Sequence, residues 1–258
     1  MRTTRKSRAH KREQVMAIKS GDDLESAAAK TVQAKYTKEI NLVLRICNLT
    51  SQIVQIPLEE GKRLSKAEIV RTLLLQRVIA DLRCLVLVAE LGYGIQAVAH
   101  ATSVFEAWLT IEAVCEEADA SRWLSHTRKD VSFGQVKAML RKVFATLPDK
   151  EPGDREKLVD RHYDHYSELC MVKHLNPIVE RARGYIRDGK ELIFVHGPDI
   201  GETGLHHVFF ALDSGAMHAW FCLIAVSKHG LRLTAEMAEE MEKIRKDIQS
   251  SRPKPESS

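Results

Sequence analysis

Apolar residues recur every three or four positions along most of the chain, which is the spacing of one face of an α-helix. A first amphipathic helix is predicted to begin with Asp22 or Asp23 as its cap and to end at Pro57, because proline interrupts a helix. Ser65 and Glu68 then form a capping box, in which the serine oxygen accepts a backbone N–H and the glutamate reaches back. A second helix is therefore expected to start at this box.

Two glycines, Gly92 and Gly94, interrupt the pattern and predict a tight turn between antiparallel helices. The helix after the turn is expected to run from Ile95 to about Cys115. A dinucleotide-binding loop is not indicated, because the segment before the turn is helical and a third glycine is missing. The turn therefore predicts helix packing rather than a cofactor site.

Two more helices are expected in the middle of the chain. Ser132 and Gln135 form another capping box, and the helix that it opens should end before Pro148. Asp154 is predicted to cap the next helix, which is rich in histidine and should end near Pro177.

The pattern changes after this proline. Two short runs with strand propensity, 185–187 and 192–195, flank the pair Asp188 and Gly189, which suits the positive φ angles of a tight hairpin turn. One small β-hairpin near 183–197 is expected. After it, the periodicity predicts an apolar core helix over 205–228 and a charged final helix that is capped by Thr234 and ends near Ser250.

These elements predict an all-α fold, a helical bundle of about six or seven helices with one small β-hairpin insertion. We expect one helical domain over residues 21–250 between two disordered tails, 1–20 and 251–258, which lack apolar periodicity. The first tail is basic. It can contact phosphate nonspecifically, although a solvated tail is the more common meaning of such a run.

Composition points to a cytoplasmic protein. The 258 residues carry a net charge of +4, and the five cysteines lie far apart, without a CxxC pair and without a secretory leader before them. They are expected to be buried, reduced thiols. The longest stretch without lysine or arginine, 84–121, contains several carboxylates and one histidine, so no membrane segment is predicted.

Titratable residues concentrate in the segment 160–177, DRHYDHYSELCMVKHLNP. Helical spacing brings His162, His165, Tyr166 and Lys173 close to one direction. Two interpretations remain open: the face lines a cleft in which an imidazole transfers protons and a cation stabilises a phosphate, or its rings are packed and hydrogen-bonded as structure. No metal and no cofactor is predicted, because no Glu-x-x-His pair is present and Asp164 points away from the histidines.

Glu106 lies within an otherwise apolar helix, where an unpaired buried carboxylate would be unfavourable. We expect it to meet Tyr166 or His174 across a helix interface, or else to lie at the surface. His100 is expected to bond a backbone carbonyl. The candidate catalytic residues are Arg161, His165, Tyr166, His174 and Glu106.

Two groups of motifs resemble a known family, the helical domain-of-unknown-function family DUF5677. The first comprises Asp81-Leu82-Arg83, Gly92-Tyr93 and Val104-Phe105-Glu106-Ala107-Trp108. The second comprises Tyr166-Ser167-Glu168-Leu169-Cys170 with His174 and Pro177, similar to the family's Tyr-x-x-Leu followed by His-x-x-Pro. The resemblance covers roughly residues 65 to 225 and implies a helical fold of unassigned function.

The chain departs from that family where an arginine commonly precedes the glutamate, because it has Thr102 and Ser103 there. The family is also similar in layout to HEPN-type domains, some of which are ribonucleases with an arginine and a histidine separated by four to six residues. In this chain Arg161 and His165 have only three residues between them, so that motif is not met.

Two functions from different classes follow. One is a noncatalytic helical interaction module that associates with itself or with a protein or RNA partner. The other is a HEPN-like ribonuclease or defence-associated effector with a cleft lined by histidine, arginine and tyrosine. An enzyme should bring Arg161 or Lys173 and at least one histidine into a shared concave opening, whereas an interaction module should bury or scatter them.

Overall fold

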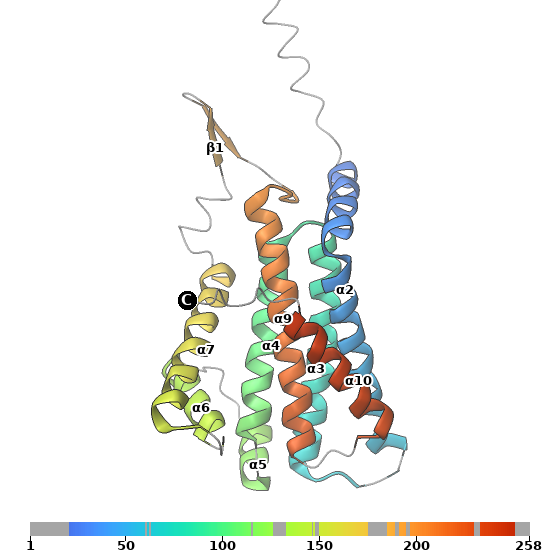
Figure 1. The fold of residues 1–258 in the computed structure, drawn as a ribbon, viewed down its shortest axis with the longest axis vertical. Coiled ribbons are helices and arrows are strands. Elements are labelled where there is room, and N and C mark those ends of the chain that lie inside the picture. The colour runs from blue at the N-terminus through green and yellow to red at the C-terminus, as the bar shows by residue number, and fades with distance from the viewer. Residues whose placement is uncertain are drawn as a thin grey trace, which may run out of the picture.

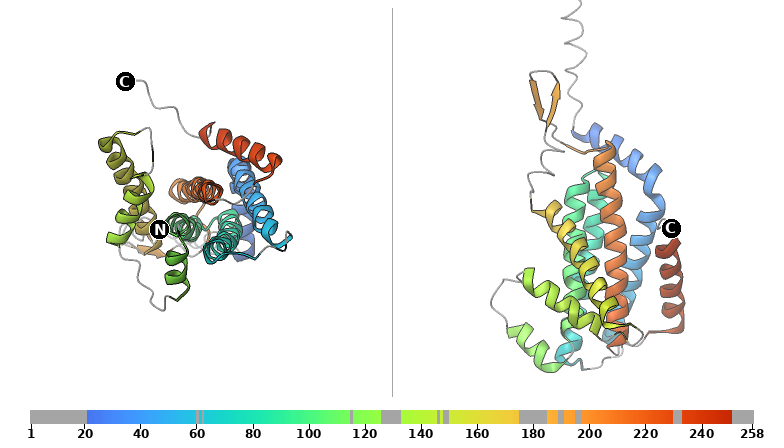
Figure 2. Two further views of the ribbon diagram at one scale, coloured as in Figure 1. Left: turned by 90° about the horizontal axis from the view of Figure 1, so that it is seen from below. Right: turned by 60° about the vertical axis from the view of Figure 1, so that its left-hand side comes forward.

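The structure of the protein is a computed structural model that describes residues 21–59, 61, 63–114, 116–125, 133–145, 147, 150–174, 185–188, 191–194, 197–229 and 233–250. In chain order the elements are α2 (Gly21–Glu59), α3 (Lys66–Glu90), α4 (Gly94–Ala113), α5 (Glu117–Ser125), α6 (Phe133–Ala145), α7 (Pro152–Lys173), β1 (Tyr185–Asp188), β2 (Glu191–Phe194), α9 (Glu202–Lys228) and α10 (Ala235–Ser250). Helices α2, α3, α4 and α9 run side by side along the long axis, with α6 and α7 on one flank and α10 on the other (Figures 1 and 2).

The all-α prediction is confirmed, with eight helices in the described residues where six or seven were expected. The additional helix is α5. The carboxylate of Glu117, its first residue, accepts hydrogen bonds from the backbone N–H groups of Lys66 at 3.2 Å and Ala67 at 3.0 Å. These groups belong to the first turn of α3, whose N–H groups have no partner within the helix, so α5 is positioned by a long-range cap.

Helix α2 is longer than its sequence predicts. It continues for two residues past Pro57, which therefore does not stop it. Proline lacks the N–H that would bond the carbonyl four residues earlier, and α2 ends within two residues of it. The helix also bends at Tyr36, whose φ of −126° is not helical, and there the phenol donates a hydrogen bond to the carbonyl oxygen of Leu205 at 2.9 Å.

The turn between α3 and α4 confirms the prediction. Gly92 has a φ of 82°, which glycine adopts without strain. A Cβ at Gly94 would lie 2.8 Å from the carbonyl oxygen of Gly204, so this glycine permits the close approach of α4 to α9. The capping box of Ser65 and Glu68 is confirmed at the start of α3.

The ends of α7 and α10 test two further caps. Asp154 does not cap α7: the helix begins at Pro152 after the cap Glu151, and the N–H of Asp154 already donates to the Glu151 carbonyl at 3.0 Å. A proline in the first helical position favours this earlier start. Helix α7 ends at Lys173, before the predicted Pro177. The cap at Thr234 is confirmed, because its hydroxyl oxygen accepts the N–H of Met237 at 3.2 Å.

Strands β1 and β2 pair in antiparallel register, with Tyr185 opposite Phe194 and Asp188 opposite Glu191. The turn chemistry predicted for Asp188 and Gly189 stays a prediction, since residues 189 and 190 lie outside the described part of the chain. The tails 1–20 and 251–258 and the predicted capping box at Ser132 lie outside it as well.

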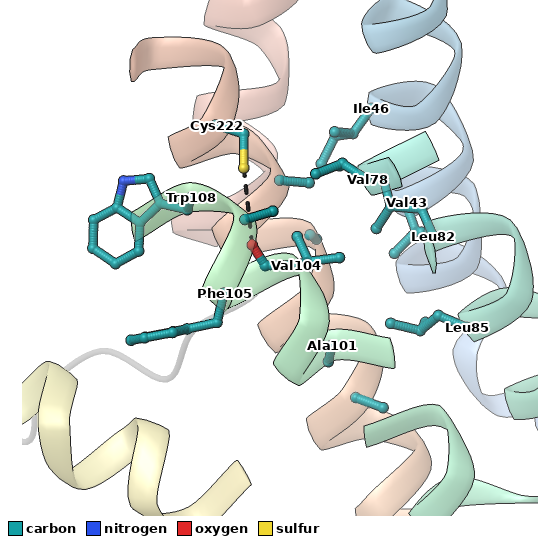
Figure 3. Packing of buried hydrophobic residues seen from close by; sticks show 14 of the residues in the cluster. Val43, Ile46, Val78, Leu82, Leu85, Ala101, Val104, Phe105, Trp108 and Cys222 are labelled. Carbon is teal, nitrogen blue, oxygen red and sulfur yellow. Dashed lines mark hydrogen bonds between the residues drawn. The ribbon is translucent and has the colours of Figure 1, made fainter. Parts of the chain in front are cut away.

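One hydrophobic core is shared by the long helices of the described residues, and the prediction of one domain over 21–250 stays a prediction. Phe105 and Val104 of α4 are fully buried, together with Ile46 of α2 and Leu82 of α3. Figure 3 shows these side chains between the helices, with the thiol of Cys222 directed at the carbonyl oxygen of Val104, 3.9 Å away.

Burial differs among the cysteines and is extensive along α9. Cys47, Cys170 and Cys222 are buried free thiols, whereas Cys84 is exposed, so the prediction of burial is wrong for this cysteine. Helix α9 is long and apolar enough to span a membrane, but 67% of its most apolar window is buried inside the fold. A helix buried in the core of a folded domain has the same length and apolar composition.

Candidate functional site

The histidines of α7 pack against aromatic rings from the neighbouring helices. The His162 ring lies 5.6 Å from Trp108 of α4, 5.1 Å from Phe144 of α6 and 5.9 Å from Phe221 of α9, measured between ring centroids. This surrounding supports the packed interpretation for His162, because aromatic contacts of this type stabilise a core.

His165 lies at the interface between α7 and α9. Its Nε2 is 3.2 Å from the hydroxyl oxygen of Ser214, and its ring centroid is 5.2 Å from that of His218. His218 is fully buried, and it is not among the candidate residues predicted from the sequence. Ser214 and His218 are one helical turn apart on an otherwise apolar helix. Two polar residues at this spacing in an apolar segment are a sequence feature from which a buried polar contact could have been predicted.

Glu106 and Tyr166 meet across the interface of α4 and α7, which confirms the predicted contact. The phenol donates to the Glu106 carboxylate at 3.2 Å, and Nζ of Lys173 lies 3.4 Å from the same oxygen. Burial raises the pKa of Tyr166 above its usual value, and the neighbouring Cys170 and Glu106 raise it further. Burial also raises the pKa of Cys170. Both groups therefore favour their protonated forms near neutral pH.

Aromatic packing fills the space between these two polar groups. The Phe105 ring stacks on Tyr166 with centroids 5.0 Å apart and contacts His218 edge to face at 4.6 Å. A fully buried ring thus lies between Tyr166, which contacts Glu106, and His218, which contacts His165.

Arg161 and His165 line a shallow surface depression of about 570 Å³. Its described lining is completed by Lys157, Asp160, Asp164 and Glu168, all of them on α7. His174 is exposed at the end of α7, where its backbone N–H donates to the Cys170 carbonyl at 2.9 Å. The structure therefore brings Glu106 to Tyr166 and Arg161 to His165, but it does not gather the five predicted residues at one place.

A further polar group lies between α3 and α4. Nε of Arg77 donates to Oδ2 of Asp81 at 2.6 Å, and Nδ1 of His100 is 3.1 Å from Oδ1 of the same carboxylate. The predicted carbonyl partner for His100 is therefore wrong. Asp81 is 4% exposed, and a buried carboxylate of this kind requires polar partners. We call these three residues the Asp81 cluster.

In the described residues no group of three or more histidine, cysteine, aspartate or glutamate side chains is arranged to hold a metal ion. Comparison of the chain with protein-family models, curated proteins and solved structures found no match. The resemblance to DUF5677 thus stays a prediction, and the function is inferred from the geometry of the residues.

Proposed function

We propose that the protein is a noncatalytic helical interaction module that associates with a second copy of itself through α3. The supporting observation is an exposed row of residues along the whole helix, the α3 stripe. Its members are Ile69, Leu73, Gln76, Ala80, Arg83 and Leu87. The three large apolar side chains, Ile69, Leu73 and Leu87, are 37%, 44% and 60% exposed.

The spacing of the α3 stripe is that of a coiled-coil interface. Steps of four and three residues alternate along it, which is the repeat of the two apolar positions in a heptad. The opposite face of α3 packs against α2, α4 and α9. A second helix that packs on the stripe would therefore cover the side of α3 that the bundle leaves in solvent.

An antiparallel copy of α3 fits the stripe better than a parallel one. In one antiparallel register each residue meets a complementary residue of the second copy: Ile69 meets Leu87, Leu73 meets the aliphatic stem of Arg83, Gln76 meets Ala80, and Lys66 meets Glu90. A parallel pair in register would place Lys66, Arg83 and Glu90 each against its own copy. Charge complementarity therefore favours the antiparallel pair.

Charge reversal tests this arrangement by sedimentation velocity. Lys66→Glu alone should weaken the dimer, because it places two carboxylates opposite each other, and Glu90→Lys alone should weaken it by placing two ammonium groups together. The two variants mixed should form a heterodimer, in which both pairs are again opposite in charge. Lys157→Glu, on the far helix α7, is the matched control and should not change the association.

Two results would contradict the proposal: a wild-type chain that sediments as a monomer at all concentrations, or single variants that associate as well as the wild type. Leu87→Glu provides a second test, because it places a charge in the apolar part of the α3 stripe and should shift the chain to the monomer. Thermal unfolding of each variant shows whether the monomer is still folded.

A second candidate is the HEPN-like ribonuclease, and one observation favours it: Arg161 and His165 line the same depression on α7. Incubation of the full chain with RNA, beside a His165→Ala and His174→Ala double variant, tests it. Loss of cleavage in the double variant is the result expected of a nuclease. Equal cleavage by both proteins, or none by either, would contradict it.

A further inference from the structure

In the Asp81 cluster one buried carboxylate holds more partners than its burial alone requires. One buried carboxylate orients two groups that both reach solvent: the side chain of Arg77 is 63% exposed and that of His100 is 32% exposed. A single partner would leave one carboxylate oxygen of a buried aspartate without a hydrogen bond. In this cluster Oδ2 bonds Arg77 and Oδ1 bonds His100. The consequence is an arginine and a histidine that lie side by side with restricted side-chain freedom.

Arg77 and His100 each keep nitrogen atoms that Asp81 does not use. Because an ionised carboxylate only accepts hydrogen bonds, the contact assigns the hydrogen to Nδ1 of His100 and leaves Nε2 for another partner. Arg77 uses Nε for Asp81, so its two terminal amino groups remain available. Within the described residues neither these amino groups nor Nε2 has a hydrogen-bond partner.

One carboxylate outside the cluster, Glu106, also acts on Arg77. Glu106 contributes to raising the pKa of Arg77, after the larger effect of Asp81, so it lies within electrostatic reach. It is compensated by Lys173, whose Nζ is 3.4 Å away, and it accepts a hydrogen bond from Tyr166. An anion that approaches Arg77 therefore meets a carboxylate that already has a cation beside it.

We propose that Arg77 and His100, oriented by Asp81, bind the phosphate group of a small phosphate monoester. The two terminal amino groups of the arginine are donors, and Nε2 of an imidazole becomes a third donor when the ring carries a second proton. Donors from two directions suit a phosphate with three terminal oxygens better than a planar carboxylate. A monoester carries up to two negative charges near neutral pH. A phosphodiester, as in RNA, carries one charge and has only two terminal oxygens.

Arg77 and His100 are not members of the α3 stripe, but Arg77 borders it beside Gln76, so the phosphate site and the self-association are tested separately. The probes are inorganic phosphate and phenyl phosphate, titrated into the full chain in chloride buffer at constant ionic strength. Binding is followed by calorimetry and by the backbone NMR signals of residues 77–81 and 97–103. We expect saturable binding of both probes, with the signal changes centred on these two segments.

The matched variants are Arg77→Gln and Arg122→Gln. Each removes one exposed arginine charge, but Arg122 pairs with the partly exposed Asp119 at 3.9 Å and not with a buried carboxylate. We expect Arg77→Gln to weaken phosphate binding at least about tenfold, and Arg122→Gln to leave it unchanged. His100→Gln should weaken binding too, because it removes the imidazole nitrogen Nε2 from the site.

Several outcomes would overturn the proposal: no saturable binding, equal losses in the two arginine variants, or tighter binding of a dinucleoside phosphodiester than of phenyl phosphate. Thermal unfolding of each variant separates loss of binding from loss of fold. Sedimentation velocity of Arg77→Gln shows whether the substitution also changes self-association. Failure of the phosphate site and failure of the dimer are therefore distinguishable.

Discussion

One hydroxyl group, that of Tyr166, connects the buried aromatic rings to the charged pair of Glu106 and Lys173. Tyr166→Phe keeps the ring stacked on Phe105 and removes the hydroxyl that donates to Glu106 and also interacts with Cys170. We expect the free energy of unfolding to fall by about 1–2 kcal/mol in urea denaturation, because the acceptor is charged and half-exposed. Tyr163→Phe on the same helix is the control and should change it by less than about 0.5 kcal/mol.

The same variant should alter the dependence of stability on pH. Burial raises the pKa of Tyr166 in the folded state, so the folded chain holds this proton more tightly than the unfolded chain, whose tyrosines titrate near 10. Stability should be unaffected by this group below about pH 10 and should fall as the pH rises further. Tyr166→Phe should lose less stability in that range. An identical alkaline loss in both proteins would contradict the assignment.

Single residues differ in how well the sequence reveals them. Glu106 could be predicted to need a partner, because its neighbours along the helix are apolar and burial of a charge is unfavourable. Asp81 offers no such signal: its two partners lie four residues before it and nineteen residues after it. His218 was missed because its contacts come from α4 and α7, and periodicity does not identify the helices that meet.

At the scale of elements, local signals gave correct ends and long-range contacts caused the errors. The capping box at Ser65 and the cap at Thr234 use atoms within three residues, so spacing alone predicts them. The start of α5 depends on the α3 backbone, and the bend of α2 at Tyr36 coincides with a hydrogen bond to Leu205 in α9. Such contacts join residues 50 or more positions apart, which no window of sequence contains.

Helix α3 shows how one element can carry two surfaces. Its 25 residues place Leu82 and Leu85 in the core, while the α3 stripe and Arg77 lie outside. The proposed dimer would cover the stripe, and the proposed phosphate site lies along one edge of it. Both proposals depend on α3 residues, whereas the site predicted from the sequence lies mainly on α7. Clustered charges and histidines are easier to recognise in a sequence than apolar residues whose exposure is known only from the fold.

At the scale of the whole molecule, burial is distributed unevenly. Helix α10 contributes two buried residues, Ile244 and Ile248, whereas α9 is buried along most of its length. Met237 and Met241 pack on the core as partly buried residues, and Arg45 of α2 pairs with Glu240 at 2.8 Å and Asp247 at 2.6 Å. These pairs are partly exposed and therefore weak, so we expect α10 to open at a lower free energy than the bundle.

Ile244→Ala tests this expectation by native-state hydrogen exchange. Loss of a fully buried isoleucine costs about 2–4 kcal/mol, and if α10 opens separately, the cost should appear as faster exchange in 235–250 with α4 and α9 unchanged. Ile46→Ala, in the core of α2, is the comparison and should lower protection in α3, α4 and α9 together. Arg45→Gln should have a smaller effect that decreases in high salt, because it removes only the partly exposed pairs. If Ile244→Ala instead lowers protection equally in every helix, α10 is part of one cooperative unit with the bundle, and the uneven burial does not divide its stability.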